Sequence, residues 1–280
     1  MRKKRIWALL VITVLCCLGF AVYLFSSQQI VDSTPPKISF ASDALQVSVS
    51  ASDAELMAGV TAWDDQDGDV TSSILVEGIA GLSSDQFATI TYAAFDQAGN
   101  VAKAQRTLQF TDYHSPRFSL SAPLAFRSGS SFNLLNYIGA EDVIDGVLDD
   151  RIKATLVSTE SALTEEGTHE VQFRVTNSMK DTAYLTVPVD IYPAGMYNAT
   201  VTLSDYLVYV EQESRFDYLD YLESFQKGAE TILLKDSSSD VSVSCDSDVN
   251  TNVPGTYSVS YTVKSGSFTG YTRMIVVVEE

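Results

Sequence analysis

A segment that occurs twice at the same spacing is the feature that most constrains the fold of this chain. Ala54–Ile74 aligns without a gap on Phe132–Ile152, and both copies carry Asp-x-x-Asp-Gly, at Asp64–Gly68 and at Asp142–Gly146. An internal repeat of this length is typical of an array of similar small units, because each unit repeats one supersecondary structure. We therefore expect tandem modules, each with its own apolar interior, in place of one large globule.

A second repeated element lies downstream of the first and is marked by an aromatic residue. Gly167–Phe173 matches Gly255–Tyr261, and Gln86–Tyr92 is a third copy in which the glycine is lost. These three aromatic residues should occupy equivalent core positions. The repeats predict three modules, with boundaries at residues 35–112, 113–193 and 194–280.

Alternation of apolar and polar residues predicts β-strands within each module. Val171, Phe173 and Val175 alternate with polar side chains, and Tyr257–Val263 shows the same period of two. Such a period marks a strand with one buried face. Turn-forming clusters separate the strands, and no long helical stripe follows residue 25. We expect an all-β fold of three tandem β-sandwiches after one N-terminal helix.

The motifs of the first module resemble those of a known family. The stretch Gly59-Val-Thr-Ala-Trp-Asp-Asp-Gln-Asp-Gly-Asp-Val-Thr71 precedes Thr91-Tyr-Ala-Ala-Phe-Asp-Gln-Ala-Gly-Asn-Val-Ala102, and Arg106-Thr-Leu108 closes the module. This pattern resembles the bacterial Ig-like domains of group 3 and of the pesticidal-crystal-protein type. The resemblance is strongest over residues 35–112, weaker over 113–193, and confined mainly to Pro254–Tyr261 in the third module. It implies immunoglobulin-like sandwiches and a surface role, without one defined activity.

The N-terminus carries four cationic residues, Arg2–Arg5, followed by twenty uncharged residues, Ile6–Phe25. At about 1.5 Å per residue, a helix of that length covers roughly the 30 Å of membrane hydrocarbon. The positive-inside rule then predicts a cytoplasmic tail at 1–5, a single transmembrane helix at 6–25, a linker at 26–34, and an extracellular location for 26–280. The alternative is a cleaved signal peptide, for which Gly19–Ala21 offers a weak cleavage site. The apolar run continues beyond that site, which favours the anchor.

The charge balance limits the classes of partner. The chain has 18 Lys and Arg against 36 Asp and Glu, and the four cationic residues before the span leave 14 outside, a formal charge of −22. A strongly anionic surface disfavours binding to nucleic acid or to an anionic membrane surface. We expect no nucleic-acid partner.

The motifs of common enzyme classes are missing from the sequence, although the count of acidic residues leaves a carboxylate pair for glycoside hydrolysis open. His114 and His169 are the only histidines, and the sequence contains no metalloprotease, nucleophile-elbow or phosphate-loop motif. Outside the predicted span Cys245 is the only cysteine, so no intrachain disulfide is expected there, and we predict a half-buried strand position for it. We predict a non-enzymatic protein without an organic cofactor.

The acidic turn of the first module is the candidate metal site. Calcium prefers six to eight oxygen ligands, and closely spaced carboxylates around a glycine turn can supply several. The loop after the Tyr92 strand could add two more ligands. The candidate calcium ligands are Asp64, Asp65, Asp67, Asp69, Asp96 and Asn100. The alternative is a tight turn in which an aspartate accepts backbone N–H groups and Gly68 takes a positive φ. The corresponding acids of the second module are a weaker candidate.

These features together predict a bacterial cell-surface protein whose array binds or scaffolds a partner, as in adhesion or display. The expected partner is a cell-surface protein or a cell-wall glycan, since exposed tyrosines stack well on sugars and serve as protein hot spots. The third module is dense in aromatic residues, among them Tyr206, Tyr209 and Tyr221. The alternative is a structural spacer or accessory subunit of an envelope complex, with no ligand of its own.

Overall fold

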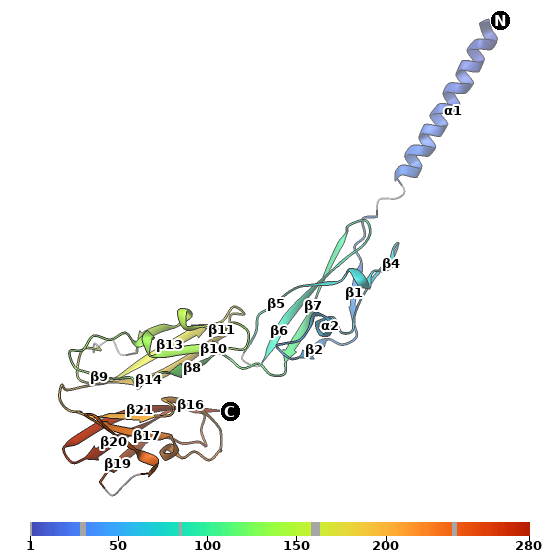
Figure 1. Cartoon of the computed structure of the whole chain (residues 1–280). Helices are drawn as coiled ribbons and strands as arrows, with labels where there is room; N and C mark the ends of the chain where they lie inside the picture. Colours follow the sequence, from blue (N-terminus) through green and yellow to red (C-terminus); the bar gives the residue numbers. More distant parts are fainter. Residues whose placement is uncertain (1, 29–31, 84–85, 158–162, 237–239) are drawn as a thin grey trace. The chain divides into compact units, whose positions relative to one another are not determined.

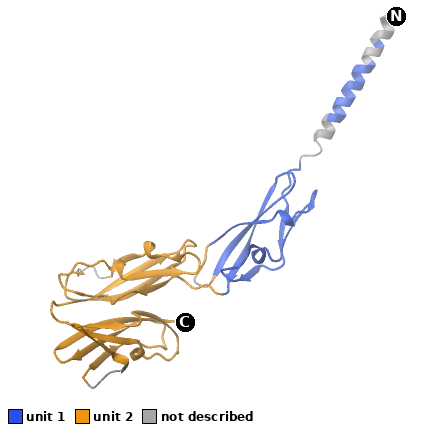
Figure 2. Ribbon diagram, in the orientation of Figure 1, with its two compact units in different colours: residues 1–80, 87–111 blue, residues 81–86, 112–280 orange. Residues whose placement is uncertain are grey.

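A computed structural model describes residues 2–28, 32–83, 86–157, 163–236 and 240–280; in the N-terminal helix it describes the side chains of residue 7 and residues 11–23. The chain divides into two compact units (Figure 2). The first unit comprises residues 1–80 and 87–111, and the second comprises residues 81–86 and 112–280. This division does not test the predicted boundaries of three modules, which stay a prediction.

The N-terminal helix is α1, Arg2–Gln28 (Figure 1). Every side chain described on it is exposed. Within the described residues, the structure contains no helix that meets the length and apolarity needed to cross a membrane. The predicted transmembrane helix is therefore not confirmed.

The first unit continues as a sandwich of two sheets. Its strands are β1 (Lys37–Phe40), β2 (Ala44–Val47), β3 (Val60–Asp64), β4 (Gly68–Asp69), β5 (Leu75–Ala80), β6 (Phe87–Phe95) and β7 (Val101–Phe110). One sheet has the order β1-β3-β4 and the other β2-β7-β6-β5. The sheets meet where the rings of Phe40 and Tyr92 lie 5.6 Å apart. A short helix, α2 (Asp53–Leu56), links β2 to β3, and Ser52 caps it with a capping box.

The second unit contains two further sandwiches of the same topology. The second sandwich is built from β8 (Arg117–Leu120), β9 (Ala125–Arg127), β10 (Ile138–Asp142), β11 (Gly146–Val147), β12 (Lys153–Leu156), β13 (Gly167–Thr176) and β14 (Thr182–Tyr192). The third is built from β15 (Thr200–Leu203), β16 (Leu207–Glu211), β17 (Leu222–Lys227), β18 (Glu230–Leu233), β19 (Ser242–Ser247), β20 (Gly255–Ser265) and β21 (Phe268–Glu279). Their sheets have the orders β11-β10-β8 with β12-β13-β14-β9, and β15-β17-β18 with β16-β21-β20-β19.

The topology confirms the internal repeat and the all-β fold. In each sandwich the second strand pairs in parallel with the last, as β2 with β7, β9 with β14 and β16 with β21. The aromatic residues Tyr92, Phe173 and Tyr261 are all fully buried. The hydroxyl of Tyr92 donates to the Leu56 carbonyl at 2.7 Å, and that of Tyr261 donates to the Tyr218 carbonyl at 2.8 Å. These residues hold equivalent core positions because the same strand pattern recurs around them.

The second and third sandwiches each have an apolar core cluster, and one buried residue of the third also packs into the cluster of the second. Ile275, on β21 of the third sandwich, is 2% exposed and belongs to the core cluster of the second. Met274, its neighbour on the same strand, packs in the core of the third. Successive side chains of a strand point to opposite faces, so β21 is buried on both. The third sandwich therefore contributes Ile275 to the apolar core of the second while keeping a core of its own.

Polar contacts also join the second and third sandwiches. The backbone N–H of Phe118 donates to the Tyr209 hydroxyl at 2.7 Å, and Arg117 pairs with Glu279. Tyr209 is largely buried, and this burial raises the pKa of its hydroxyl to about 12, so the phenol stays protonated as a neutral partner.

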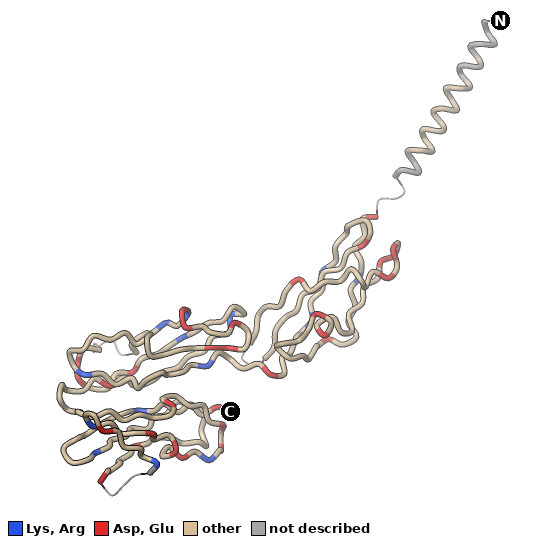
Figure 3. Tube along the Cα trace, in the orientation of Figure 1, with Lys and Arg blue, Asp and Glu red and all other residues tan. Residues whose placement is uncertain are grey.

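Acidic residues are spread over both units (Figure 3).

Candidate metal centre and binding groove

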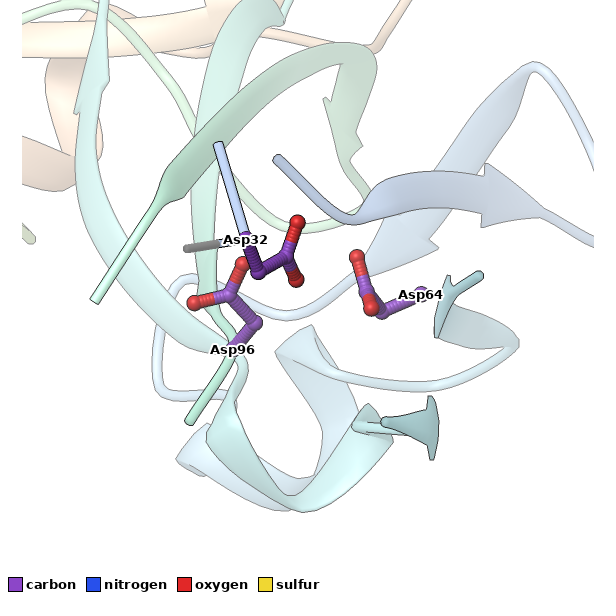
Figure 4. Close-up of side chains that lie close together, drawn as sticks. All are labelled: Asp32, Asp64 and Asp96. Atoms are coloured by element: carbon purple, nitrogen blue, oxygen red, sulfur yellow. The ribbon is translucent and has the colours of Figure 1, made fainter. Parts of the chain in front are cut away.

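Three carboxylates of the first unit converge at one end of its sandwich (Figure 4). Asp32 precedes β1, Asp64 ends β3, and Asp96 follows β6. One carboxylate oxygen of each lies within 4.8 Å of the others. Asp64 is 2% exposed and Asp96 is 8% exposed. Three acidic groups are thus gathered in a largely dry position.

Two oxygens in this cluster have no hydrogen-bond partner among the residues that the structure describes. Asp64 Oδ1 accepts from the backbone N–H groups of Gln66, at 2.8 Å, and Asp67, at 3.0 Å, but its Oδ2 is buried and unpaired. Asp32 Oδ1 accepts from the N–H and the hydroxyl of Thr34, and its Oδ2 is likewise buried and unpaired. A buried carboxylate oxygen without a partner is costly. Among the described residues, these two oxygens therefore have neither a donor nor a positive charge to compensate them.

Asn100 connects the cluster to the segment that precedes β1. Its backbone N–H donates to Asp96 Oδ1 at 2.8 Å, and its side-chain Nδ2 donates to Asp96 Oδ2 at 2.7 Å. The same Nδ2 donates to the Asp32 carbonyl at 3.1 Å. Burial raises the pKa of Asp96, but the hydrogen bonds from Asn100 and the neighbouring backbone outweigh it and hold the pKa below its usual value. Asp96 is therefore a carboxylate at neutral pH, and Asn100 positions it.

The other predicted ligands lie apart from this cluster. Asp67 Oδ2 accepts from the N–H of Gln97 at 2.7 Å. Asp69 accepts from Thr71, whose side-chain and backbone hydrogen bonds lower the pKa of Asp69. Asp65 is exposed. These residues shape the turn, with Gly68 at φ +75°, as the alternative interpretation expected.

Asp32 is the residue that sequence reasoning missed. It falls in the stretch 26–34, which was interpreted as a linker, far in sequence from the acidic turn. The signal that could have found it is the aspartate immediately upstream of the first strand of the module. Nothing in the spacing specified that this strand would bring it beside Asp64.

The second sandwich holds an equivalent arrangement that is fully paired. Asp142, the counterpart of Asp64, accepts from the N–H groups of Ile144 and Asp145 through Oδ1. Its Oδ2 accepts from Asn177 Nδ2 at 2.7 Å, where the first sandwich has Asp96. Asn177 Nδ2 also donates to the Tyr113 hydroxyl, at 2.9 Å.

Tyr113 completes this second arrangement. Its hydroxyl donates to Asp181 Oδ2 at 2.6 Å, and Ser115 donates to the same oxygen at 2.7 Å. Burial, with the charge and hydrogen bond of Asp181, raises the pKa of Tyr113, so the hydroxyl keeps its proton. Amide and hydroxyl donors thus stand where the first sandwich presents carboxylates. The described residues include no second acidic cluster of the same kind.

A groove lined by tyrosines lies where the second sandwich meets the third. Its volume is about 530 Å³, and its walls include Tyr192, Tyr197, Tyr206 and Tyr271. The rings of Tyr197 and Tyr271 stack with centroids 5.2 Å apart and an interplanar angle of 13°. Asn198, Thr200 and Gln226 add polar side chains to the lining.

Asp190 fixes one wall of this groove. It accepts a hydrogen bond from the Tyr271 hydroxyl at 2.7 Å and pairs with Arg273 at 3.0 Å. Burial is the main cause that raises the pKa of Tyr271 to about 12, so the ring presents a neutral hydroxyl. Asp190 lies on β14 and Tyr271 on β21, so this contact ties the two sandwiches together at the groove.

The remaining singled-out residues are structural. His169 is buried on β13 and its Nε2 lies 2.8 Å from the Glu165 carbonyl. His114 precedes β8 in the sequence, and its Nδ1 lies 3.0 Å from the Ser115 carbonyl. Cys245 is half-buried on β19, as predicted, and burial raises the pKa of its thiol.

Comparison with known proteins finds matches among solved structures only. No family model matches the chain, and no curated protein matches it. Solved structures with a similar arrangement include the protocadherin gamma-B4 extracellular domain, with 13% identity over 89% of this chain and 50% of that one, at a TM-score of 0.21. Mouse cadherin-23 EC22-24 shows 14% identity over 88% and 99% of the two chains, at 0.22. A Clostridium perfringens ZmpB fragment with CBM51-2 and INT domains shows 16% over 87% and 42%, at 0.22. These TM-scores are too low to support an argument about function.

Proposed function

We propose that the chain is a membrane-anchored bacterial surface protein whose tandem sandwiches bind a cell-wall glycan, in an adhesion or display role without catalysis. The tyrosine-lined groove of the second unit is the observation that carries this proposal. The resemblance of residues 35–112 to group 3 bacterial Ig-like domains supports a place on the cell surface. The common enzyme motifs are missing from the sequence, and this supports a binding role.

The anchor is proposed from the sequence and exposure of α1. Its described side chains, from Val11 to Tyr23, are apolar or uncharged and all exposed. A helix that is hydrophobic all round is buried in a larger structure or in a membrane. The cationic residues Arg2–Arg5 before it favour a cytoplasmic N-terminus, with residues 26–280 outside.

We expect the full chain to stay in the membrane pellet after an alkaline carbonate wash, because Ile6–Phe25 partitions into hydrocarbon. A variant that lacks residues 1–25 but carries a separate export signal should be released into the supernatant. Release of the full chain by the same wash would contradict the anchor.

The groove suits a carbohydrate in both shape and chemistry. Ligand sites are concave and combine aromatic walls with a few placed polar groups. Tyrosine presents an apolar face for a sugar ring and a hydroxyl for its polar edge. The phenols of Tyr197 and Tyr271 are neutral, since burial raises the pKa of both. A neutral groove on an acidic protein favours an uncharged polymer segment.

Tyr197→Ala is expected to weaken binding of the detergent-solubilised full chain to purified cell-wall polysaccharide by about tenfold, the size of a hot-spot loss. The matched control is Tyr184→Ala, which removes a tyrosine that is 60% exposed on β14 and lies outside the groove lining. Sedimentation with insoluble wall material, or calorimetry with soluble fragments, measures the affinity.

Equal affinities of the two variants would reject the groove as the binding site. A wild-type chain that binds neither polysaccharide nor insoluble wall would support the spacer alternative. Partners that co-purify with the intact chain from its own membranes would then define the envelope complex that it serves.

A further inference from the structure

The first sandwich carries charge that its own fold leaves uncompensated. Asp64 is only 2% exposed and its buried Oδ2 has no hydrogen-bond partner among the described residues, while one carboxylate oxygen each of Asp32, Asp64 and Asp96 lies within 4.8 Å of the others (Figure 4). Like charges this close repel in a dry environment, where screening by water is weak. A carboxylate cluster of this kind is stable when a cation neutralises it.

We propose that Asp32, Asp64 and Asp96 form a calcium site that fastens the segment before β1 to the first sandwich. The two unpaired oxygens, Asp32 Oδ2 and Asp64 Oδ2, are ligands in this site, together with a carboxylate oxygen of Asp96. This site is independent of the glycan-binding groove, which lies in the other unit.

The donor set favours calcium over magnesium. All three side-chain ligands are carboxylates, the hard oxygen donors that both ions prefer. Magnesium is usually held by one or two carboxylates and keeps most of its waters, whereas calcium accepts more protein oxygens in irregular geometry. Three carboxylates from three separate segments match calcium.

The second sandwich shows what the same position contains when no cation is needed. There Asn177 replaces Asp96, and its amide donates to Asp142 Oδ2. Asp181 stands where the first copy has Asn100, and the Tyr113 hydroxyl donates to it. In the second sandwich, Asn177 and Tyr113 donate hydrogen bonds to the carboxylates of Asp142 and Asp181. The first sandwich has the same turn, around Asp64, without these two donors.

Calcium at this site would order the chain where it enters the first sandwich. Asp32 follows α1 by a few residues, and its carbonyl is already held by Asn100. Ligation of its carboxylate joins this segment to β3 and to the loop after β6. The ion would thereby stiffen the connection between the proposed anchor and the array.

The test is calcium titration of the full chain in detergent after removal of metals with a chelator. Calorimetry should detect one site per chain, with a Kd on the order of 10⁻⁴ M, as in extracellular calcium modules. Asp32→Asn should weaken binding by about tenfold or more, because a charged ligand is lost. Asp65→Asn removes an exposed aspartate of the same turn and should change the affinity by less than about twofold, since exposed charges are screened.

Hydrogen exchange locates the ion and separates this site from diffuse binding to an acidic surface. Calcium should slow amide exchange at 32–34, 64–67 and 96–100, and should leave the equivalent segments 142–145 and 177–181 unchanged. Magnesium at the same concentration should protect these segments less. Absence of calcium binding, or an Asp32→Asn variant that binds calcium as tightly as the wild type, would overturn the proposal.

Discussion

Asn177→Asp is expected to lower the free energy of unfolding of the second unit by about 3 to 5 kcal/mol, the range for a buried charge that loses its partner. Asn177 is 2% exposed, and its Nδ2 donates to both Asp142 Oδ2 and the Tyr113 hydroxyl. A carboxylate in its place has no proton to donate at neutral pH. It would also lie beside Asp142, so two buried carboxylates would face each other without a donor between them.

Denaturant unfolding of the full chain, followed by circular dichroism, measures this loss. The matched control is Asn252→Asp, the same chemical change at an exposed position, for which a change within about 0.5 kcal/mol is expected. If both variants unfold at the wild-type midpoint, the paired network of the second sandwich contributes nothing to its stability. The result would contradict the idea that the second sandwich depends on internal donors where the first has carboxylates.

The second large effect concerns Ile275, the buried residue through which the third sandwich packs into the core of the second. Ile275→Ala should cost about 2 to 5 kcal/mol, because a cavity is left at a site that cannot collapse fully. The cavity lies between the sandwiches, so this variant should also uncouple them. We expect two unfolding transitions for the second unit of Ile275→Ala where the wild type shows one.

Met274→Ala is the control for this prediction. Met274 is as deeply buried and is adjacent on β21, but it packs in the core of the third sandwich. Its replacement should destabilise by a similar amount and keep a single transition. A single transition for Ile275→Ala as well, at any midpoint, would contradict a coupling that passes through Ile275.

The repeated topology could be predicted from the sequence because its signals are local. The Asp-x-x-Asp-Gly turn and the aromatic positions Tyr92, Phe173 and Tyr261 each reflect a strand pattern with one buried face. The run Met274–Val278, a closing strand by its sequence, is apolar throughout. A continuous apolar strand is typical of burial on both faces, and this is how β21 joins two sandwiches.

The candidate metal site could be predicted only in part. Asp64 lies in one loop of the first module, and Asp96 and Asn100 lie in another. The strand order brings these two loops to the same end of the sandwich, so the grouping could be predicted. Asp32 could not be foreseen, because no periodicity links it to them. The difference in hydrogen bonding between the two copies could not be predicted either. The effect of Asn177 in place of Asp96 depends on which atoms its amide contacts, and the sequence does not show these contacts.

If the first sandwich holds a cation where the second has internal donors, crystals of the chain grown with calcium should show the ion by anomalous diffraction. One peak is predicted, at about 2.3–2.6 Å from carboxylate oxygens of Asp32, Asp64 and Asp96, with none beside Asp142 and Asn177. An empty map at the first position, or equal peaks at both, would contradict it.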